Sequence, residues 1–175
     1  MCDEALRLVV SENALKLHRE YLIDIEHKIS ILRKSIPGLS DTINEVIRGS
    51  FQKEVKREAI VLLFERDCHK IFFESFAEVP GEVPCIKSRY SSENAFVYEL
   101  YRYILKHGNG IYCVYRDRRG NFCFDRAEVV YPFTTDKILI VDFCEHSYFL
   151  DYGFNMEKYL RNALSHLNLA RLSGD

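Results

Sequence analysis

The spacing of apolar residues along the 175-residue chain changes from helical to strand-like near residue 108 and returns to helical near residue 154, and this pattern limits the fold more than any other feature. Up to about His107, apolar residues recur every three or four positions, which is typical of amphipathic helices. After Gly108-Asn109-Gly110 the sequence is rich in β-branched and aromatic residues, which favours strands. Helices, then a small antiparallel sheet, then a last helix predict an α+β fold.

Two long helices are expected before the sheet. The first covers residues 11–34, where Ser11 can cap the helix and Pro37 follows its end. Residues 39–51 are typical of a short helix or connector, and the second long helix covers residues 51–76. Two such helices predict an antiparallel helical hairpin.

A cluster of proline and glycine, VPGEVP at residues 79–84, marks the expected boundary between two halves. It predicts an N-terminal helical hairpin domain over residues 1–80 and a C-terminal α/β domain over residues 85–175. The second domain is expected to begin with a helix at residues 91–107 and to end with a helix at residues 154–172. Between them, three strands at residues 111–115, 121–130 and 137–142 are expected to form an antiparallel sheet.

Composition and charge exclude several classes of protein. A hydrophobic content of 47% is enough for a buried core and argues against a disordered or coiled-coil chain. A net charge of -2 argues against nucleic-acid binding through phosphate neutralisation. No apolar run is long enough to cross a membrane. Six cysteines without a CxxC pair, and no signal peptide before them, predict reduced thiols in a cytoplasmic protein.

Two histidines lie on apolar faces of the expected hairpin helices. His18 falls within the apolar stripe of the first helix, and His69 shares a face with Leu62 and Phe72 on the second. A single histidine in such a place is more often a hydrogen-bonded core residue than a ligand. Two histidines on antiparallel helices, however, can meet across the hairpin.

The segment VDFCEHSYFLDY, residues 141–152, adds a carboxylate and a third imidazole. Asp142 and His146 are four residues apart, so they converge on one ion if the chain turns into a helix there. In the alternative interpretation, Asp142 caps a helix and His146 faces solvent. Together with the two hairpin histidines, this pair would complete a site of three nitrogens and one oxygen, which suits Zn, Fe, Mn or Cu and leaves a position open.

In these segments the chain resembles the iron/manganese superoxide dismutases. VDFCEHSYFLDY is similar to the C-terminal signature of that family, and the resemblance extends over residues 11–172. It is carried further by the seven-residue step from Ser11 to His18, by CHKIFF around His69, by Gly108-Asn109-Gly110 and by Pro132-Phe133-Thr134-Thr135-Asp136.

The resemblance implies a role for each of these residues. It makes His18, His69, Asp142 and His146 the ligands of one Mn or Fe ion per chain. It also implies a homodimer in which Glu145 reaches the partner's His146. The implied substrate is superoxide, which the family converts to dioxygen and hydrogen peroxide.

The chain departs from the family around the metal. Leu22 and Glu26 stand where the family has the His and Tyr that line the substrate entrance, and Glu26, with Glu145, is a candidate for a functional side chain near the metal. Glu65 and Val129 stand at the two places that supply a glutamine to metal-bound solvent.

Other polar groups near the entrance are also changed or uncertain. Phe149 replaces a tyrosine, and the chain has no Trp. Tyr21 or His27 would restore a polar entrance if the helix were rotated slightly, although both are typical of surface positions.

These departures leave three interpretations. The leading one is a metal-dependent superoxide dismutase with altered surroundings of the metal. The alternative is a catalytically inactive dismutase-fold protein that binds metal or serves as a structural or interaction component, and the third is zinc bound for stability. Four buried ionisable groups are costly without a cation, which favours retention of a metal.

Overall fold

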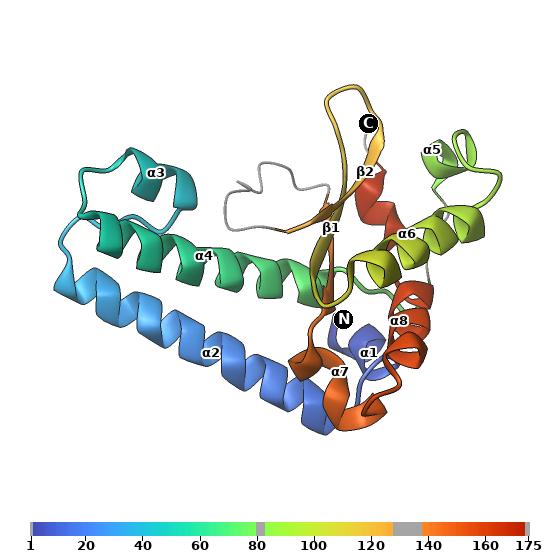
Figure 1. Cartoon of the computed structure of the whole chain (residues 1–175), viewed down its shortest axis with the longest axis horizontal. Coiled ribbons are helices and arrows are strands. Elements are labelled where there is room, and N and C mark those ends of the chain that lie inside the picture. Colours follow the sequence, from blue (N-terminus) through green and yellow to red (C-terminus); the bar gives the residue numbers. More distant parts are fainter. Residues whose placement is uncertain (1, 80–82, 128–137, 174–175) are drawn as a thin grey trace.

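The N-terminal half of the chain is a helical hairpin, as expected. A computed structural model describes residues 2–79, 83–127 and 138–173. Helix α2 (Glu12–Ser35) runs antiparallel to α4 (Lys53–Glu74), and the short α3 (Ile43–Arg48) covers the far end of the pair (Figure 1). The hydroxyl of Ser11 accepts a hydrogen bond from the Ala14 N–H and caps α2, which confirms the predicted start of that helix.

The C-terminal half contains the predicted three-stranded antiparallel sheet. Strands β1 (Gly110–Arg116), β2 (Phe122–Arg126) and β3 (Ile138–Phe143) are arranged in the order β2-β1-β3. All six residues of β3 are buried. Because Ile111 of β1 pairs with Asp142, the register holds Asp142 at the end of β3. The α+β class is therefore confirmed.

Helices pack on this sheet and connect it to the hairpin. Ser92 caps α6 (Glu93–His107), and α7 (Glu145–Tyr152) begins directly after β3. Two short helices, α1 (Cys2–Arg7) and α5 (Pro84–Lys87), were not predicted from the sequence. Within the described ranges, no helix is long and apolar enough to span a membrane.

The last predicted helix, residues 154–172, is interrupted. The structure has α8 (Met156–Ser165) and then a 3₁₀ helix (Leu169–Leu172). Between them the carbonyl of His166 accepts a hydrogen bond from the Ala77 N–H, and the Asn168 N–H donates to the Ser75 carbonyl. The prediction of one continuous helix is wrong because the chain forms these bonds with the end of α4 instead.

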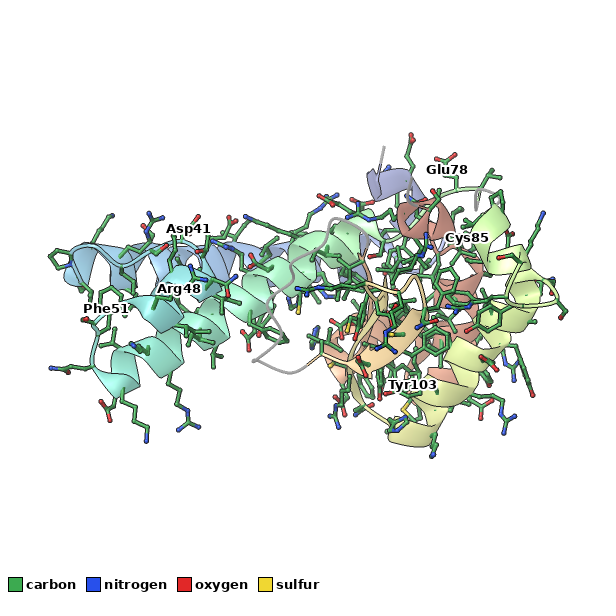
Figure 2. The ribbon with its side chains drawn as sticks, turned by 90° about the horizontal axis from the view of Figure 1, so that it is seen from above. Asp41, Arg48, Phe51, Glu78, Cys85 and Tyr103 are labelled. Carbon is green, nitrogen blue, oxygen red and sulfur yellow. The ribbon has the colours of Figure 1, made fainter. Side chains whose placement is uncertain are left out.

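The main hydrophobic core contains residues from both halves. Leu15, Phe72 and Phe76 of the hairpin are buried together with Leu139 of β3 and Leu160 of α8. A second cluster fills the far part of the hairpin, at Ile25, Ile29, Leu39, Ile43, Val46, Ala59, Leu63, Phe64 and Cys68. In Figure 2 the hairpin projects from the C-terminal half, with Asp41, Arg48 and Phe51 at its far end. Val129 and the segment 132–136 of the resemblance lie outside the described residues.

Candidate metal centre

The four residues expected to bind metal come together from four different elements. His18 lies on α2, His69 on α4, Asp142 at the end of β3 and His146 in the first turn of α7. One possible ligand atom from each residue lies within 4.8 Å of the other three. The hairpin thus supplies two donors and the C-terminal half supplies two.

Local structure explains why these side chains point toward one another. His18 follows the buried Leu15 by three residues on α2, and His69 precedes the buried Phe72 by three residues on α4. Residues three apart share a helix face, so both histidines point into the molecule. Because α7 begins at Glu145, the side chain of His146 turns back toward Asp142.

The three imidazoles surround one carboxylate oxygen. Oδ2 of Asp142 lies 2.8 Å from Nε2 of His146, 3.3 Å from that of His18 and 4.0 Å from that of His69. Nε2 of His18 and Nε2 of His69 are buried, and neither forms a hydrogen bond with the described residues. A buried polar atom left without a partner costs about 1–3 kcal/mol. A cation bound by both nitrogens would remove this cost, so the donor set fits a metal ion.

Hydrogen bonds from neighbouring groups orient these donors. Nδ1 of His69 donates to the carbonyl of Glu65 at 2.7 Å, which leaves its Nε2 facing the cluster. Oδ1 of Asp142 accepts the Cys144 N–H at 3.0 Å, and the backbone carbonyl of Asp142 accepts the Tyr159 hydroxyl at 2.8 Å. Bonds of this kind fix the tautomer and direction of metal ligands.

The electrostatics of the cluster favour the metal-binding protonation state at Asp142 and His69 and oppose it at His146. Burial alone would raise the pKa of Asp142, but the hydrogen bond with His146 and the nearby His18 lower it well below its usual range. Burial lowers the pKa of His69. Burial also acts to lower the pKa of His146, but its hydrogen bond to Asp142 raises the net value. An ionised carboxylate and neutral imidazoles are the forms that coordinate a cation.

Tyr21 and Glu65 lie directly beside the cluster. The ring centroid of Tyr21 is 5.1 Å from that of His69 and 5.6 Å from that of His146. Its hydroxyl donates to Oε2 of Glu65 at 3.2 Å. Burial and the Glu65 carboxylate raise the pKa of Tyr21 to about 12, so the hydroxyl keeps its proton at neutral pH.

Sequence reasoning placed Tyr21 at the surface, and the side chain is indeed 40% exposed. Its contacts with the two histidines were missed, although no rotation of the helix is needed for them. The available signal was spacing, because Tyr21 follows His18 by three residues and so lies close to the same face of α2.

The two glutamates proposed from the sequence do not join the cluster. Glu26 is exposed, and its carboxylate forms an ion pair of 2.7 Å with Lys70. Glu145 is exposed on α7, where its carboxylate accepts a hydrogen bond from the Asn109 side chain. Their functional roles stay predictions.

The fold and this donor set define an α+β protein in which three histidines and one aspartate form a group that could hold a metal ion. A family model, described as iron/manganese superoxide dismutases, C-terminal domain, matches residues 83–174, more than half of the chain. The chain therefore belongs to the iron/manganese superoxide dismutase family. The comparison with curated proteins gives no significant match. Asp142 and His146 lie inside the matched segment, whereas His18 and His69 precede it.

Proposed function

We propose that the chain is a superoxide dismutase that holds one Mn or Fe ion with His18, His69, Asp142 and His146. The observation that carries the proposal is a pair of buried Nε2 atoms, without a hydrogen bond among the described residues, that lie 3.3 and 4.0 Å from one buried carboxylate oxygen. The bound metal would supply the one-electron chemistry that converts superoxide to dioxygen and hydrogen peroxide. A single anionic ligand among three neutral ones would lower the charge of the site.

The protein groups around the donors would control access and water. His18 is shielded by the rings of Phe72 and Phe73, whose centroids lie 5.0 and 5.9 Å from its own. The side chain of His146 is 46% exposed, so the cluster is reached from this side. A small anion can approach the cluster from the side of His146. On the side of His18, the rings of Phe72 and Phe73 would exclude water.

The first experiment measures bound metal and activity on the same sample. The protein is purified without added metal or chelator, then assayed by elemental analysis and by superoxide consumption. We expect about one Mn or Fe ion per chain, with activity that follows occupancy. His69→Ala should lose metal and activity together, because it removes one donor. The control His107→Ala changes an exposed histidine on α6 and should lose neither. Full activity in a metal-free sample would contradict the proposal.

A second candidate function is a metal-binding protein of this family without catalysis. It is favoured by Leu22 and Phe149, which place no polar group where the family has a His and a Tyr. In that case the same sample would hold metal without consuming superoxide, or would hold zinc in place of Mn or Fe.

We further propose a homodimer through the face around Glu145 and His146. Phe149 and Leu150 of α7 are 51% and 56% exposed next to this pair, and apolar side chains of that size favour burial against a partner. A chain that sediments as a monomer at micromolar concentration would contradict the dimer. A cytoplasmic location stays a prediction that rests on the cysteine pattern.

A further inference from the structure

One side chain connects both hairpin helices to the metal cluster. Tyr21 on α2 donates its hydroxyl to Glu65 on α4, and the same ring lies against the imidazoles of His69 and His146. The two rings of Tyr21 and His146 are nearly parallel, with an angle of 30° between their planes. These contacts fix a half-exposed ring that would otherwise turn freely in solvent.

The ring lies at the solvent-exposed side of the cluster, against His69 and His146. His18 and His69 are almost fully buried, and Phe72 and Phe73 close the side of His18 that faces the core. On the other side, Tyr21 and His146 are the groups with large exposed fractions. Tyr21 thus lies beside the exposed ligand His146, at the side from which the cluster is reached.

Glu65 contributes to this arrangement through two atoms. Its backbone carbonyl accepts Nδ1 of His69, and its carboxylate accepts the hydroxyl of Tyr21. One residue thus aligns an imidazole and the ring that packs against it. The carboxylate also places a negative charge beside the entrance, which favours retention of a cation.

We propose that Tyr21, held by Glu65, is a positioning residue of the metal site that fixes His69 and His146 and slows exchange of the bound ion with solvent. This inference rests on the proposed metal site. It assigns no proton transfer to Tyr21, whose hydroxyl proton is already donated to Glu65.

The test uses Co²⁺ as the metal, because its visible absorption reports ligand geometry without any dismutase activity. The full chain is loaded with Co²⁺ and mixed with excess EDTA, and release is followed by loss of the visible bands. Tyr21→Ala should release the ion roughly 10- to 100-fold faster, as for loss of other groups that orient metal ligands, and should shift the bands. Tyr21→Phe keeps the ring and loses only the Glu65 bond, so its release rate should lie between those of Tyr21→Ala and the unchanged chain.

The control is Tyr98→Ala, which removes another exposed tyrosine, on α6 and away from the cluster. It should release Co²⁺ at the unchanged rate. Circular dichroism of each metal-free variant checks that the helices still form. Release from Tyr21→Ala at the unchanged rate, or equal acceleration in Tyr98→Ala, would overturn the inference.

A double-mutant cycle tests the link to Glu65. If the hydroxyl and the carboxylate act as one unit, Tyr21→Phe and Glu65→Ala together should release Co²⁺ more slowly than the product of their separate effects predicts. Independent, multiplying effects would contradict the role of Glu65. A chain that binds no Co²⁺ at all would instead contradict the metal site itself, so the two failures are distinguishable.

Discussion

At the scale of single residues, buried polar atoms that form no hydrogen bond indicate where a further binding partner would be favourable. Nε2 of His18 and Nε2 of His69 form no hydrogen bond within the described residues and lie near the Asp142 carboxylate, where a bound metal ion would give both a partner. The hydroxyl of Ser147 is also buried without a hydrogen bond among the described residues. Among the described residues, the groups that could hold a metal do not include Ser147, so we treat this hydroxyl as a cost to stability rather than part of a site.

Replacing Ser147 should therefore stabilise the protein. Ser147→Ala removes the unpartnered hydroxyl, and we expect a gain of about 1 kcal/mol in the free energy of unfolding, at the lower end of the cost of a buried unpaired group. Urea unfolding of the metal-free chain measures it. A loss of stability would show that Ser147 has a hydrogen-bond partner in solution.

Replacing Tyr159 should have the opposite effect and lower the free energy of unfolding. Its buried hydroxyl donates to the backbone carbonyl of Asp142, so Tyr159→Phe leaves that carbonyl without this bond. We expect a loss of about 1–2 kcal/mol in unfolding free energy. Co²⁺ affinity should also fall, because Asp142 is held less firmly. Tyr98→Phe, at an exposed position, is the matched control and should change neither quantity.

At the scale of elements, sequence patterns predicted what depends on local periodicity. The long helices α2 and α4, their connection and the three strands follow from apolar spacing and from turn residues close in sequence. The break after Ser165 was missed because its cause lies at the end of α4, where Ser75 and Ala77 bond the returning chain. The bond between Tyr21 and Glu65 likewise depends on the packing of α2 against α4, because Glu65 is remote in sequence.

Ser75 links these elements at one point. Its hydroxyl accepts the Ile140 N–H of β3 at 2.8 Å and donates to the Ile71 carbonyl. Ser75→Ala leaves a buried N–H unpaired, so we expect a loss of about 1–3 kcal/mol in unfolding free energy. Ser88→Ala, which removes an exposed hydroxyl, should cost much less. Equal losses in the two variants would mean that the bond to β3 contributes little.

At the scale of the whole molecule, the candidate site and the main core both need the two halves. Leu15, Phe72 and Phe76 of the hairpin are buried against the sheet and α8. The division at residues 80–85 stays a prediction about the organisation of the chain, and the structure offers a way to test it. The resemblance to the family singled out the four residues of the cluster, and the packing of the two halves brings their side chains together; their role as metal ligands stays a prediction.

Residues 1–80 alone should therefore not form the stable hairpin of the full chain. Without the C-terminal half, Leu15, Phe72 and Phe76 are exposed, and each such side chain contributes about 1.5–3 kcal/mol when buried. By circular dichroism, the fragment should contain less helix than the same residues form in the full chain. It should also show no cooperative thermal transition. A cooperative transition in the isolated fragment would support an independent N-terminal domain.

The distribution of the donors along the chain also determines when a metal can be acquired. His18 and His69 leave the ribosome early, but Asp142 and His146 are synthesised only after most of the chain is complete. Before β3 and α7 are synthesised, the hairpin carries only two of the four donors and lacks the core residues that β3 and α8 supply. A metal held by all four residues could therefore be bound only once β3 and the start of α7 dock against the hairpin.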